Sequence, residues 1–402
     1  MHYGGVPAKR ATTPTPKPGS QSALRRRNSQ LIIDTLARRG PTTQATLSRV
    51  TGLSTGTVSN LVKLLESADL VSSTPTIDSG RRALAIGLRA GGRLVAGISV
   101  GRNSLRILLS GLDQRIVAEA HAPLPRGHAP ADSFAAAARL LDETLTRHQL
   151  DPSMVAQVGI SLPAVLDRTA STMLAPDALL PNWEDVVLLP LAEATLGLPC
   201  VLDNDANLGA LAQVTFGPFK DTADLAYVKV AAGIGAGLIL DHELRRGGLG
   251  TAGEIGHTMV VSNGEYCRCG NRGCLETLAS TTRISARVAR ELRTSLTDES
   301  LISLARQREP HTLRALEDAG SSLGVAVASL CSLLNPTAVV IGGTITAVGA
   351  PLMDPLYRAF HRQSFSGLAH KTTLVANQLG SRTDALGAIA LAIRSVPVSP
   401  SS

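Results

Sequence analysis

The stretch that decides the fold is CRCGNRGCLE at residues 267–276, which holds three of the chain's five cysteines. Three thiolates are soft metal ligands, and glycines at 270 and 273 let a short loop curl around an ion. Tetrahedral zinc needs one further ligand, so the stretch predicts a structural metal site that is completed from elsewhere in the chain. A redox-active thiol cluster is the alternative. The two other cysteines, Cys200 and Cys331, lie in apolar runs and are expected to be buried.

Composition limits the class of protein. The chain has 402 residues, enough for two or three domains around a large core. No run of about 18 apolar residues occurs, so a membrane span is not expected. The first twenty residues lack the apolar segment of a secretory signal, which indicates a cytoplasmic protein in which disulfides are a poor interpretation of the cysteines. Aromatic residues make up 2% of the chain, which argues against stacking platforms for single-stranded nucleic acid.

Positive charge is concentrated in the first 90 residues, which hold 13 Lys and Arg against four Asp and Glu. Their net charge of +9 exceeds the +7 of the whole chain, so the remaining residues carry −2. A basic head on a near-neutral body favours a module that binds a polyanion. A solubilising basic tail is the alternative. Residues 1–21 are rich in Pro, Ser and Thr and are expected to form a disordered tail.

Residues 22–90 carry the pattern of a winged helix-turn-helix. A first helix is expected to end at Gly40, Thr43 to cap a second helix, and Gly52 to form the turn before a third helix capped by Ser54. Residues 73–88 then predict two strands joined by a turn, which would be the wing. The apolar residues expected on the inner faces of the three helices are Leu24, Leu31, Ile32 and Leu36, then Leu47 and Val50, then Val58, Leu61, Val62 and Leu65.

The surface of this module offers groups that suit double-stranded DNA. Short polar side chains on the third helix suit base edges, whereas basic residues in the first helix, the third helix and the wing suit phosphates or a minor groove. The residues expected to contact DNA are Arg25, Arg26, Arg27, Ser54, Thr55, Thr57, Ser59, Asn60, Lys63, Arg81 and Arg82. A three-helix module for protein contacts is the alternative.

From Leu94 onwards strands and helices alternate, which predicts an α/β body. Three successive strands are expected, followed by a helix and a buried strand, over residues 94–100, 105–112, 115–120, 131–150 and 155–163. Later segments place strands before polar or glycine-rich loops, over residues 199–207, 225–240 and 327–345. Loops at strand ends are where α/β proteins hold ligands.

Several motifs together resemble the ROK family, which groups sugar-responsive transcriptional repressors with sugar kinases. They are TGLSTGTVSNLVKLLE and SGRR in the winged-helix region, NDAN at 204–207, GIGAG at 233–237, AGEIGH at 252–257, CRCGNRGCLE at 267–276 and NPTAVVIGG at 335–343. The resemblance covers the chain from about residue 22. It implies an actin-like (ribonuclease H-like), two-lobed body of the sugar kinase type behind the winged helix.

The expected division of the chain follows from the pattern and the resemblance together. A tail at 1–21 precedes the DNA-binding domain at 22–90, and an effector-binding and oligomerisation domain spans 91–402. Within that domain the first lobe is expected at about 91–205 and the second at about 206–380. The resemblance implies that a helix at about 381–396 returns to the first lobe.

The resemblance also assigns site residues. It makes His257 the fourth metal ligand, beside Cys267, Cys269 and Cys274, and a site with four protein ligands is structural. The other imidazole nitrogen of His257 is implied to meet a sugar hydroxyl, with the metal fixing its tautomer. The implied sugar-binding residues are Asn204, Asp205, Glu254, His257 and Glu276. Among these, Asp205 matches the residue that acts as the base in the family's kinases.

The first hairpin of the body departs from the family's kinases, which have Asp-x-Gly-Gly-Thr where this chain reads SVGRN at 99–103. Ser99 brings no negative charge for a cation, and Arg102 fills space that backbone approach to a phosphate requires. Gln213 and the Ala231-Ala232 pair also depart from the family's common residues. No catalytic residue is therefore expected.

The sequence predicts a DNA-binding transcriptional regulator, with a repressor favoured, of carbohydrate-utilisation genes. A sugar bound in a catalytically degenerate, kinase-like site is expected to modulate operator binding. An ATP-dependent sugar kinase with an appended DNA-binding domain is one alternative, and a regulator controlled by a protein partner is the other. The expected partners are a DNA operator, a sugar or sugar derivative, and further copies of the chain in a homodimer or homotetramer, with zinc as a structural cofactor.

Overall fold

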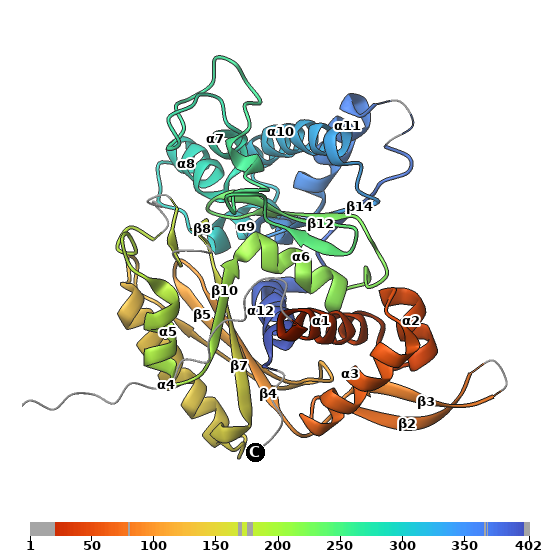
Figure 1. The fold of residues 1–402 in the computed structure, drawn as a ribbon. Helices are drawn as coiled ribbons and strands as arrows, with labels where there is room; N and C mark the ends of the chain where they lie inside the picture. Colours follow the sequence, from red (N-terminus) through yellow and green to blue (C-terminus); the bar gives the residue numbers. More distant parts are fainter. Residues whose placement is uncertain are drawn as a thin grey trace, which may run out of the picture.

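The computed structural model describes residues 21–78, 81–167, 171–174, 180–365, 367 and 369–397. A winged helix-turn-helix precedes an α/β body that contains two five-stranded sheets (Figure 1). Of the tail expected at 1–21, only Gln21 is described, and it begins the first helix. The tip of the wing at residues 79–80 and the side chains of Arg26 and Arg81 lie outside the description.

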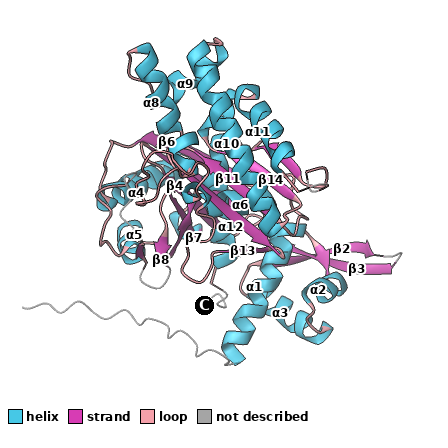
Figure 2. Cartoon of the chain, turned by 90° about the horizontal axis from the view of Figure 1, so that it is seen from above, coloured by secondary structure: helices cyan, strands magenta, loops and turns pink. Residues whose placement is uncertain are grey.

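The winged helix-turn-helix consists of α1 (Gln21–Arg39), β1 (Thr42–Thr43), α2 (Gln44–Thr51), α3 (Thr55–Ser67), β2 (Val71–Asp78) and β3 (Arg81–Leu88). The predicted caps are confirmed: the side chain of Thr43 accepts a hydrogen bond from the N–H of Thr46 (3.3 Å), and that of Ser54 from Thr57 (3.1 Å). Gly52 ends α2 with a φ of 72°, a conformation that favours glycine. Strands β2 and β3 form the wing, which projects away from the body (Figure 2).

Two apolar residues predicted to face the core lie at the surface instead. Leu24 is 57% exposed because it is in the first turn of α1, whereas the buried positions of that helix begin at Ser29. Val50 is 37% exposed in the last turn of α2. The four residues predicted on the inner face of α3 are all buried, as are Cys200 and Cys331.

The body has the predicted α/β architecture, with the actin-like, two-lobed arrangement built on one sheet per lobe. The first sheet has the order β10-β7-β4-β5-β6, from β4 (Leu94–Val100), β5 (Ser104–Gly111), β6 (Ile116–Pro123), β7 (Val155–Leu162) and β10 (Cys200–Asn204). The second has the order β13-β12-β11-β14-β15, from β11 (Leu225–Val230), β12 (Ile234–Leu240), β13 (Glu243–Arg245), β14 (Ala338–Gly342) and β15 (Thr373–Ala376).

Both sheets follow the same plan. Three antiparallel strands come first, and the first of them is the central strand, β4 in one sheet and β11 in the other. A fourth strand then pairs in parallel with the central strand, and a fifth pairs in parallel with the fourth. In each half a helix follows the last strand: α6 (Asp205–Thr215) follows β10, and α12 (Thr383–Ser395) follows β15. These two helices pack against each other between the sheets (Figure 1). The body is therefore a structural duplication around a central pair of helices.

The other helices cover the outer faces of the sheets. The first half carries α4 (Pro130–Arg147) and α5 (Leu188–Leu196), and the short strands β8 (Leu166–Asp167) and β9 (Thr172–Met173). The second half carries α7 (Leu275–Ala279), α8 (Thr281–Leu292), α9 (Asp298–Arg306), α10 (Pro310–Leu334) and α11 (Ala350–Gln363). Each half buries its own apolar cluster between sheet and helices. In the described part of the chain, no helix has the length and apolar character needed to cross a membrane.

Close packing fixes α12 on the first sheet. A Cβ added to Gly97 of β4 would lie 2.3 Å from a carbonyl oxygen of α12, and one added to Gly159 of β7 would lie 2.0 Å from another. On the other side of the helix, a Cβ on Gly387 would lie 1.9 Å from the carbonyl oxygen of Leu208 in α6. No side chain separates these backbones, so α12 is held by direct backbone contact with both the sheet and α6.

The winged helix shares a core with the body. One apolar cluster contains residues of α1, α3 and the wing together with residues of β4, β5 and α12. Ile33 of α1 and Ile393 of α12 line a gap between the two modules that has no room for water. In Figure 1 these two helices lie side by side. The winged helix-turn-helix is therefore packed directly on the helix that lies at the centre of the body.

Candidate functional site

The loop of residues 252–257 lies directly against β12 because two of its residues lack a side chain. A Cβ on Gly253 would lie 1.8 Å from the carbonyl oxygen of Ala236, and one on Gly256 would lie 2.2 Å from that of Ile234. The N–H of Ala236 donates to the carbonyl oxygen of Gly253 at 2.7 Å. This contact places Glu254 and His257 beside the second sheet.

The segment of residues 204–207 lies on the other side of β12. The side chain of Asn204 begins α6 by accepting hydrogen bonds from the N–H groups of Ala206 (2.9 Å) and Asn207 (3.3 Å). Its amide nitrogen donates to the carbonyl oxygen of Ala164 (3.0 Å) in the first half of the body. A Cβ on Gly237 would lie 2.2 Å from the carbonyl oxygen of Ala206, so α6 and β12 are in backbone contact. Strand β12 therefore joins both groups of predicted sugar-binding residues.

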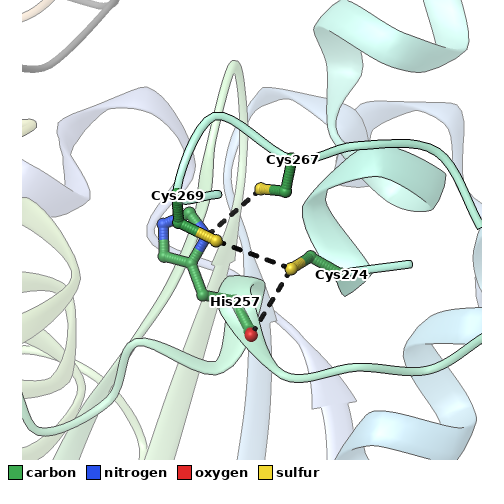
Figure 3. Close-up of side chains that lie close together, drawn as sticks. All are labelled: His257, Cys267, Cys269 and Cys274. Atoms are coloured by element: carbon green, nitrogen blue, oxygen red, sulfur yellow. Dashed lines mark hydrogen bonds between the residues drawn. The ribbon is translucent and has the colours of Figure 1, made fainter. Parts of the chain in front are cut away.

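Four predicted metal ligands converge at one point (Figure 3). The ligand atoms of His257, Cys267, Cys269 and Cys274 all lie within 4.8 Å of one another. Nδ1 of His257 is 3.5 Å from Sγ of Cys267, and Sγ of Cys269 is 3.7 Å from Sγ of Cys274. Ligand atoms on a tetrahedral zinc ion with bonds of about 2.3 Å would be roughly 3.8 Å apart. The described residues therefore contain a His/Cys₃ cluster that could hold a metal ion.

The thiols of this cluster differ in acidity. Burial, followed by hydrogen bonding to Cys269 and Cys267, raises the pKa of Cys274 to about 12. At Cys269 desolvation also raises the pKa, but hydrogen bonds from Asn271 and the neighbouring thiols outweigh it, so the pKa falls below its ordinary value. Without a cation, Cys274 is therefore a protonated thiol at neutral pH, and a metal ion has to displace its proton.

Glu276 lies directly behind the cysteine loop and is 8% exposed. Its carboxylate accepts a hydrogen bond from the N–H of Ile234 in β12 (3.1 Å). It also accepts two hydrogen bonds from Arg268, at 2.7 Å from Nε and 3.2 Å from Nη2. Because Arg268 lies between two of the cysteines, the loop that gathers the thiols also holds this carboxylate.

Two further carboxylates at the candidate site are paired with cations. Asp203, 6% exposed at the end of β10, accepts a hydrogen bond from Nε of Arg246 at 2.7 Å. Asp205, in the first turn of α6, forms an ion pair of 2.7 Å with Lys229 of β11. Lys229 also lies 2.6 Å from a carboxylate oxygen of Asp384 in α12. Burial raises the pKa of Asp205, and Lys229 opposes that rise.

Sequence reasoning missed these three cations. Lys229 is a single charged residue inside the apolar strand LAYVKV, a pattern that signals a buried partner, but its partners are distant in the sequence. Arg246 follows β13 with no motif around it, and Arg268 lies between two cysteines whose spacing does not indicate its partner. Packing between separate elements brings Lys229 to Asp205 and Arg246 to Asp203, whereas the fold of the cysteine loop brings Arg268 to Glu276.

Glu254, the remaining residue of the predicted sugar site, lies beside the metal cluster. Nε2 of His257, on the side of the ring away from Cys267, is 3.9 Å from a carboxylate oxygen of Glu254. The side chains of Glu254 and His257 are 33% and 23% exposed, so both retain contact with solvent. One imidazole nitrogen thus faces the thiols while the other faces a half-buried carboxylate.

The predicted DNA contacts lie on one module. Ser54, Thr55, Asn60 and Lys63 of the α3 region are exposed, and Thr57 and Ser59 are half-buried. Arg25 and Arg27 of α1 and Arg82 of β3 are also exposed. The hydroxyls of Ser54 and Thr57 lie 2.8 Å apart, so Ser54 both caps α3 and pairs with a neighbouring candidate. The exposed groups combine short polar side chains with cations, which suits a nucleic-acid surface.

At the first hairpin of the body, the structure places no acid among residues 101–103. Ser99 is half-buried in β4, whereas Arg102 and Asn103 are exposed. The N–H of Gly101 donates to the carbonyl oxygen of Ser104 at 2.8 Å, which closes the hairpin.

Two family profiles match the chain. The profile of the ROK family matches residues 95–395, about three quarters of the chain, and that of the MarR family matches residues 31–82. The chain is 29% identical over 391 residues to a putative xylose repressor from Caldicellulosiruptor sp. (strain Rt8B.4), with 93% of this chain and 97% of that protein covered. It is 28% identical over 393 residues to the DNA-binding transcriptional dual regulator NagC of Escherichia coli (strain K12), with 94% and 95% covered.

Solved structures show the same fold. A ROK family transcriptional regulator, described as a homolog of the E. coli MLC protein, superposes with a TM-score of 0.76 at 24% identity, covering 92% of this chain and 97% of that one. A ROK family glucokinase from Streptomyces griseus, in complex with glucose and AMPPNP, superposes with a TM-score of 0.65 at 26% identity. That match covers 74% of this chain and 99% of the glucokinase.

Proposed function

The chain belongs to the ROK family, and on that premise we propose that it is a DNA-binding repressor of carbohydrate-utilisation genes whose operator binding is modulated by a bound sugar. The observation that carries the proposal is the shared apolar core between the winged helix-turn-helix and the kinase-like body. The similarity to a putative xylose repressor and to the NagC regulator over more than nine tenths of the chain supports it.

The winged helix supplies the DNA-binding surface in this proposal. Residues 22–90 would form the DNA-binding domain, with α3 in the major groove and the wing and α1 against the backbone. The exposed contacts would be Arg25, Arg27, Ser54, Thr55, Asn60, Lys63 and Arg82, with Thr57 and Ser59 beside them and Arg26 and Arg81 in the same segments. Short hydroxyl and amide groups would read base edges, and the cations would neutralise phosphates.

The body supplies the effector site. Residues 91–402 would bind the sugar through Asn204, Asp205, Glu254, His257 and Glu276, which gather around β12. Sugars present rings of hydroxyls that both donate and accept, and this set offers carboxylates, an amide and an imidazole to meet them. The lobes would be residues 91–205 with the helix at 381–396, and residues 206–380. A homodimer or homotetramer would let two winged helices bind one operator.

We propose zinc as the ion of the His/Cys₃ cluster. Three thiols and an imidazole within 4.8 Å are the donor set that structural zinc takes. Zinc bound there would cross-link the loop. The metal site would orient the ring of His257. Its Nδ1 would face the metal, which leaves Nε2 as a defined hydrogen-bond donor toward the sugar and Glu254. The same loop would hold Arg268 against Glu276.

We propose that the chain is not a sugar kinase. The first hairpin offers Ser99 and an exposed Arg102 in place of the acid and glycine with which the family's kinases handle metal and phosphate. Asp205, the residue at the position of the kinase base, is engaged by Lys229 at 2.7 Å. A carboxylate that is already paired with an ammonium is a weaker acceptor for a hydroxyl proton.

Two experiments on the full chain test this function. Duplexes selected by the protein from a random library give its operator, whose binding should weaken steeply as salt rises. Lys63→Ala should lower operator affinity and reduce the salt slope by about one, whereas Lys371→Ala, at an exposed position just before β15 of the second sheet, should do neither. A library from which no duplex is enriched would remove the DNA-binding function.

The second experiment is a thermal-shift panel of D-xylose, N-acetylglucosamine, D-glucose and ATP with magnesium. A ligand that binds the folded state raises the melting temperature. The proposal expects a shift with one sugar and none with ATP. A shift with ATP, accompanied by phosphate transfer to a sugar, would establish the kinase instead. Silence with every sugar, together with selective DNA binding, would point to control by a protein partner.

A further inference from the structure

A buried ion cluster lies where the two halves of the body meet. The ammonium of Lys229 is 2.7 Å from Asp205 and 2.6 Å from Asp384, and the three side chains are 14%, 15% and 23% exposed. Burial opposes the charge of Lys229, but the two carboxylates outweigh it and raise the pKa of Lys229 above its ordinary value. The lysine is therefore a cation that holds two anions together.

The three members of this cluster come from three central elements. Lys229 is the next-to-last residue of β11, the central strand of the second sheet. Asp205 and Asp384 both lie in first helical turns, those of α6 and α12. Those helices occupy matching places in the two halves and are in backbone contact at Gly387. One cation of the second sheet thus fastens the beginnings of both central helices.

The far end of α12 meets the DNA-binding module. Ile393 packs with Ile33 of α1 across the gap between the two modules. Arg394 lies 3.9 Å from Asp34 of α1. Within the described residues, Nε and Nη2 of this buried guanidinium have no hydrogen-bond partner.

The guanidinium of Arg394 also affects Arg38 of α1. Burial, followed by the charge of Arg394, lowers the pKa of Arg38. The junction therefore holds two cations, and the ion pair that Arg394 forms there, with Asp34, is long at 3.9 Å. A buried guanidinium with unpaired N–H groups costs free energy, so this contact adds little stability to the present arrangement of α1 and α12.

We propose that Lys229 is a pin that couples the effector site to the DNA-binding module through α12. With the site empty, the pin holds Asp205, Asp384 and hence the first turn of α12 in the arrangement that binds DNA. Asp205 belongs to the proposed sugar site, so this inference rests on the proposed function. A sugar hydroxyl that engages Asp205 competes with Lys229 for the carboxylate, so Lys229 and the Asp384 that it holds can move away from α6, which shifts the first turn of α12 and its junction with α1. A ligand can bias the two arrangements only through such a difference in contacts.

The test compares four forms of the full chain: wild type, Asp384→Asn, Lys229→Arg and Arg287→Met. Asp384→Asn removes one anion of the pin and leaves the ion pair of Lys229 with Asp205. Lys229→Arg keeps the positive charge, so it serves as the conservative variant that should retain the pin. Arg287→Met is the matched control, because it removes an ion pair of 2.8 Å with Asp318 whose members are 51% and 69% exposed.

The first arm needs no sugar. Fluorescence anisotropy with a duplex selected by the wild type gives the operator affinity, and hydrogen exchange reports on α1 and α12. Asp384→Asn is expected to weaken operator binding at least fivefold, the lower end of typical allosteric couplings, and to speed exchange in both helices. Lys229→Arg should stay within about twofold of the wild type, as should Arg287→Met.

The second arm adds whichever sugar of the thermal-shift panel the wild type binds. Asp384→Asn should bind that sugar within about threefold of the wild-type affinity. The factor by which the sugar changes operator affinity should nevertheless fall at least fivefold toward one, because the variant already resembles the released state. A purely structural role for Asp384 would lower stability and leave that factor unchanged.

Two outcomes overturn the pin. One is an Asp384→Asn variant with wild-type operator affinity and a wild-type response to sugar. The other is an Arg287→Met variant that changes as much as Asp384→Asn. If the wild type binds none of the sugars of the thermal-shift panel, the sugar part of the proposed function fails, and the sugar-free arm alone decides whether Lys229 holds α12 for DNA binding.

Discussion

The two halves of the body share one strand order but carry different chemistry on it. The next-to-last residue of the central strand is Ser99 in the first half and Lys229 in the second. In the first half, the chain passes from the third antiparallel strand to the fourth strand through α4. In the second half, the corresponding connection is a long segment that holds the His/Cys₃ cluster. The comparison teaches that the duplicated scaffold supplies positions, and that substitutions and insertions in one half supply the candidate chemistry.

The largest expected effect concerns the metal cluster, which within the described residues belongs to the second half alone. Cys274→Ser should lower zinc affinity by roughly a hundredfold to a thousandfold, since a structural site worth about 10–16 kcal/mol divides that free energy among four ligands. Competition with a colorimetric chelator measures it. Ser110→Ala, at a buried position of the first half, is the control and should leave zinc affinity unchanged. Undiminished zinc binding by Cys274→Ser would remove the metal assignment.

The pH dependence of metal uptake follows from the same thiols. Because the pKa of Cys274 is raised to about 12, this thiol is protonated in the metal-free protein at neutral pH. Binding must release that proton, so apparent zinc affinity should rise with pH, by about tenfold per unit for each proton released. Chelator competition between pH 6 and pH 8 measures the slope. An affinity independent of pH would mean that the thiols are not ligands.

The glycine contacts should have equal effects in the two halves. Gly159→Ala would place a Cβ 2.0 Å from a carbonyl oxygen of α12, and Gly237→Ala would place one 2.2 Å from a carbonyl oxygen of α6. Each clash is with backbone, so each variant should lose about 3 kcal/mol of unfolding free energy. Denaturant unfolding checks both. Gly235→Ala, whose nearest contact would be an ordinary 3.5 Å, serves as the control. A large difference in unfolding free energy between Gly159→Ala and Gly237→Ala would show that the two sheets do not hold their central helices equally tightly.

Features that rest on local sequence signals could be predicted from the sequence, whereas features that rest on tertiary contacts could not. The motifs predicted both modules, the caps at Thr43 and Ser54, and the convergence of His257 with three cysteines, because each of these signals is local or belongs to the family resemblance. The exposed Leu24 and Val50 were mispredicted because a helical period does not show where a helix leaves the core. The duplication and the pairing of Lys229 with Asp384 depend on contacts between segments far apart, and the pairing of Arg268 with Glu276 depends on how the cysteine loop folds back on itself; single-sequence patterns contain neither kind of information.

A smaller effect is expected at the sugar site. Asp205→Asn keeps the shape of the side chain but removes a charge that both Lys229 and a sugar hydroxyl would use. Sugar affinity should fall about tenfold, the size of one hydrogen bond to a charged group. Isothermal calorimetry measures it, and Asp203→Asn, whose partner is Arg246, tests whether any acid of the region has the same effect. Unchanged sugar binding by Asp205→Asn would place the sugar elsewhere.

The smallest effect is expected in the first half. Ser99→Asp restores an acid at the position where the family's kinases have one, yet Arg102 and the ion pair of Asp205 with Lys229 remain. The variant should therefore show no ATP-dependent phosphate transfer, which a coupled assay for ADP release can check. Activity gained through this one substitution would show that the first half differs from a kinase by a single charge.

The most direct test of the central claim is one titration. The full chain is bound to its selected duplex, and D-xylose or N-acetylglucosamine is added while fluorescence anisotropy reports the bound fraction. The account predicts release at sugar concentrations that match the affinity measured without DNA, together with a reciprocal weakening of sugar binding by the duplex. Sugar that binds the protein but leaves both the anisotropy and its own affinity unchanged would contradict the claim that the kinase-like body controls the winged helix.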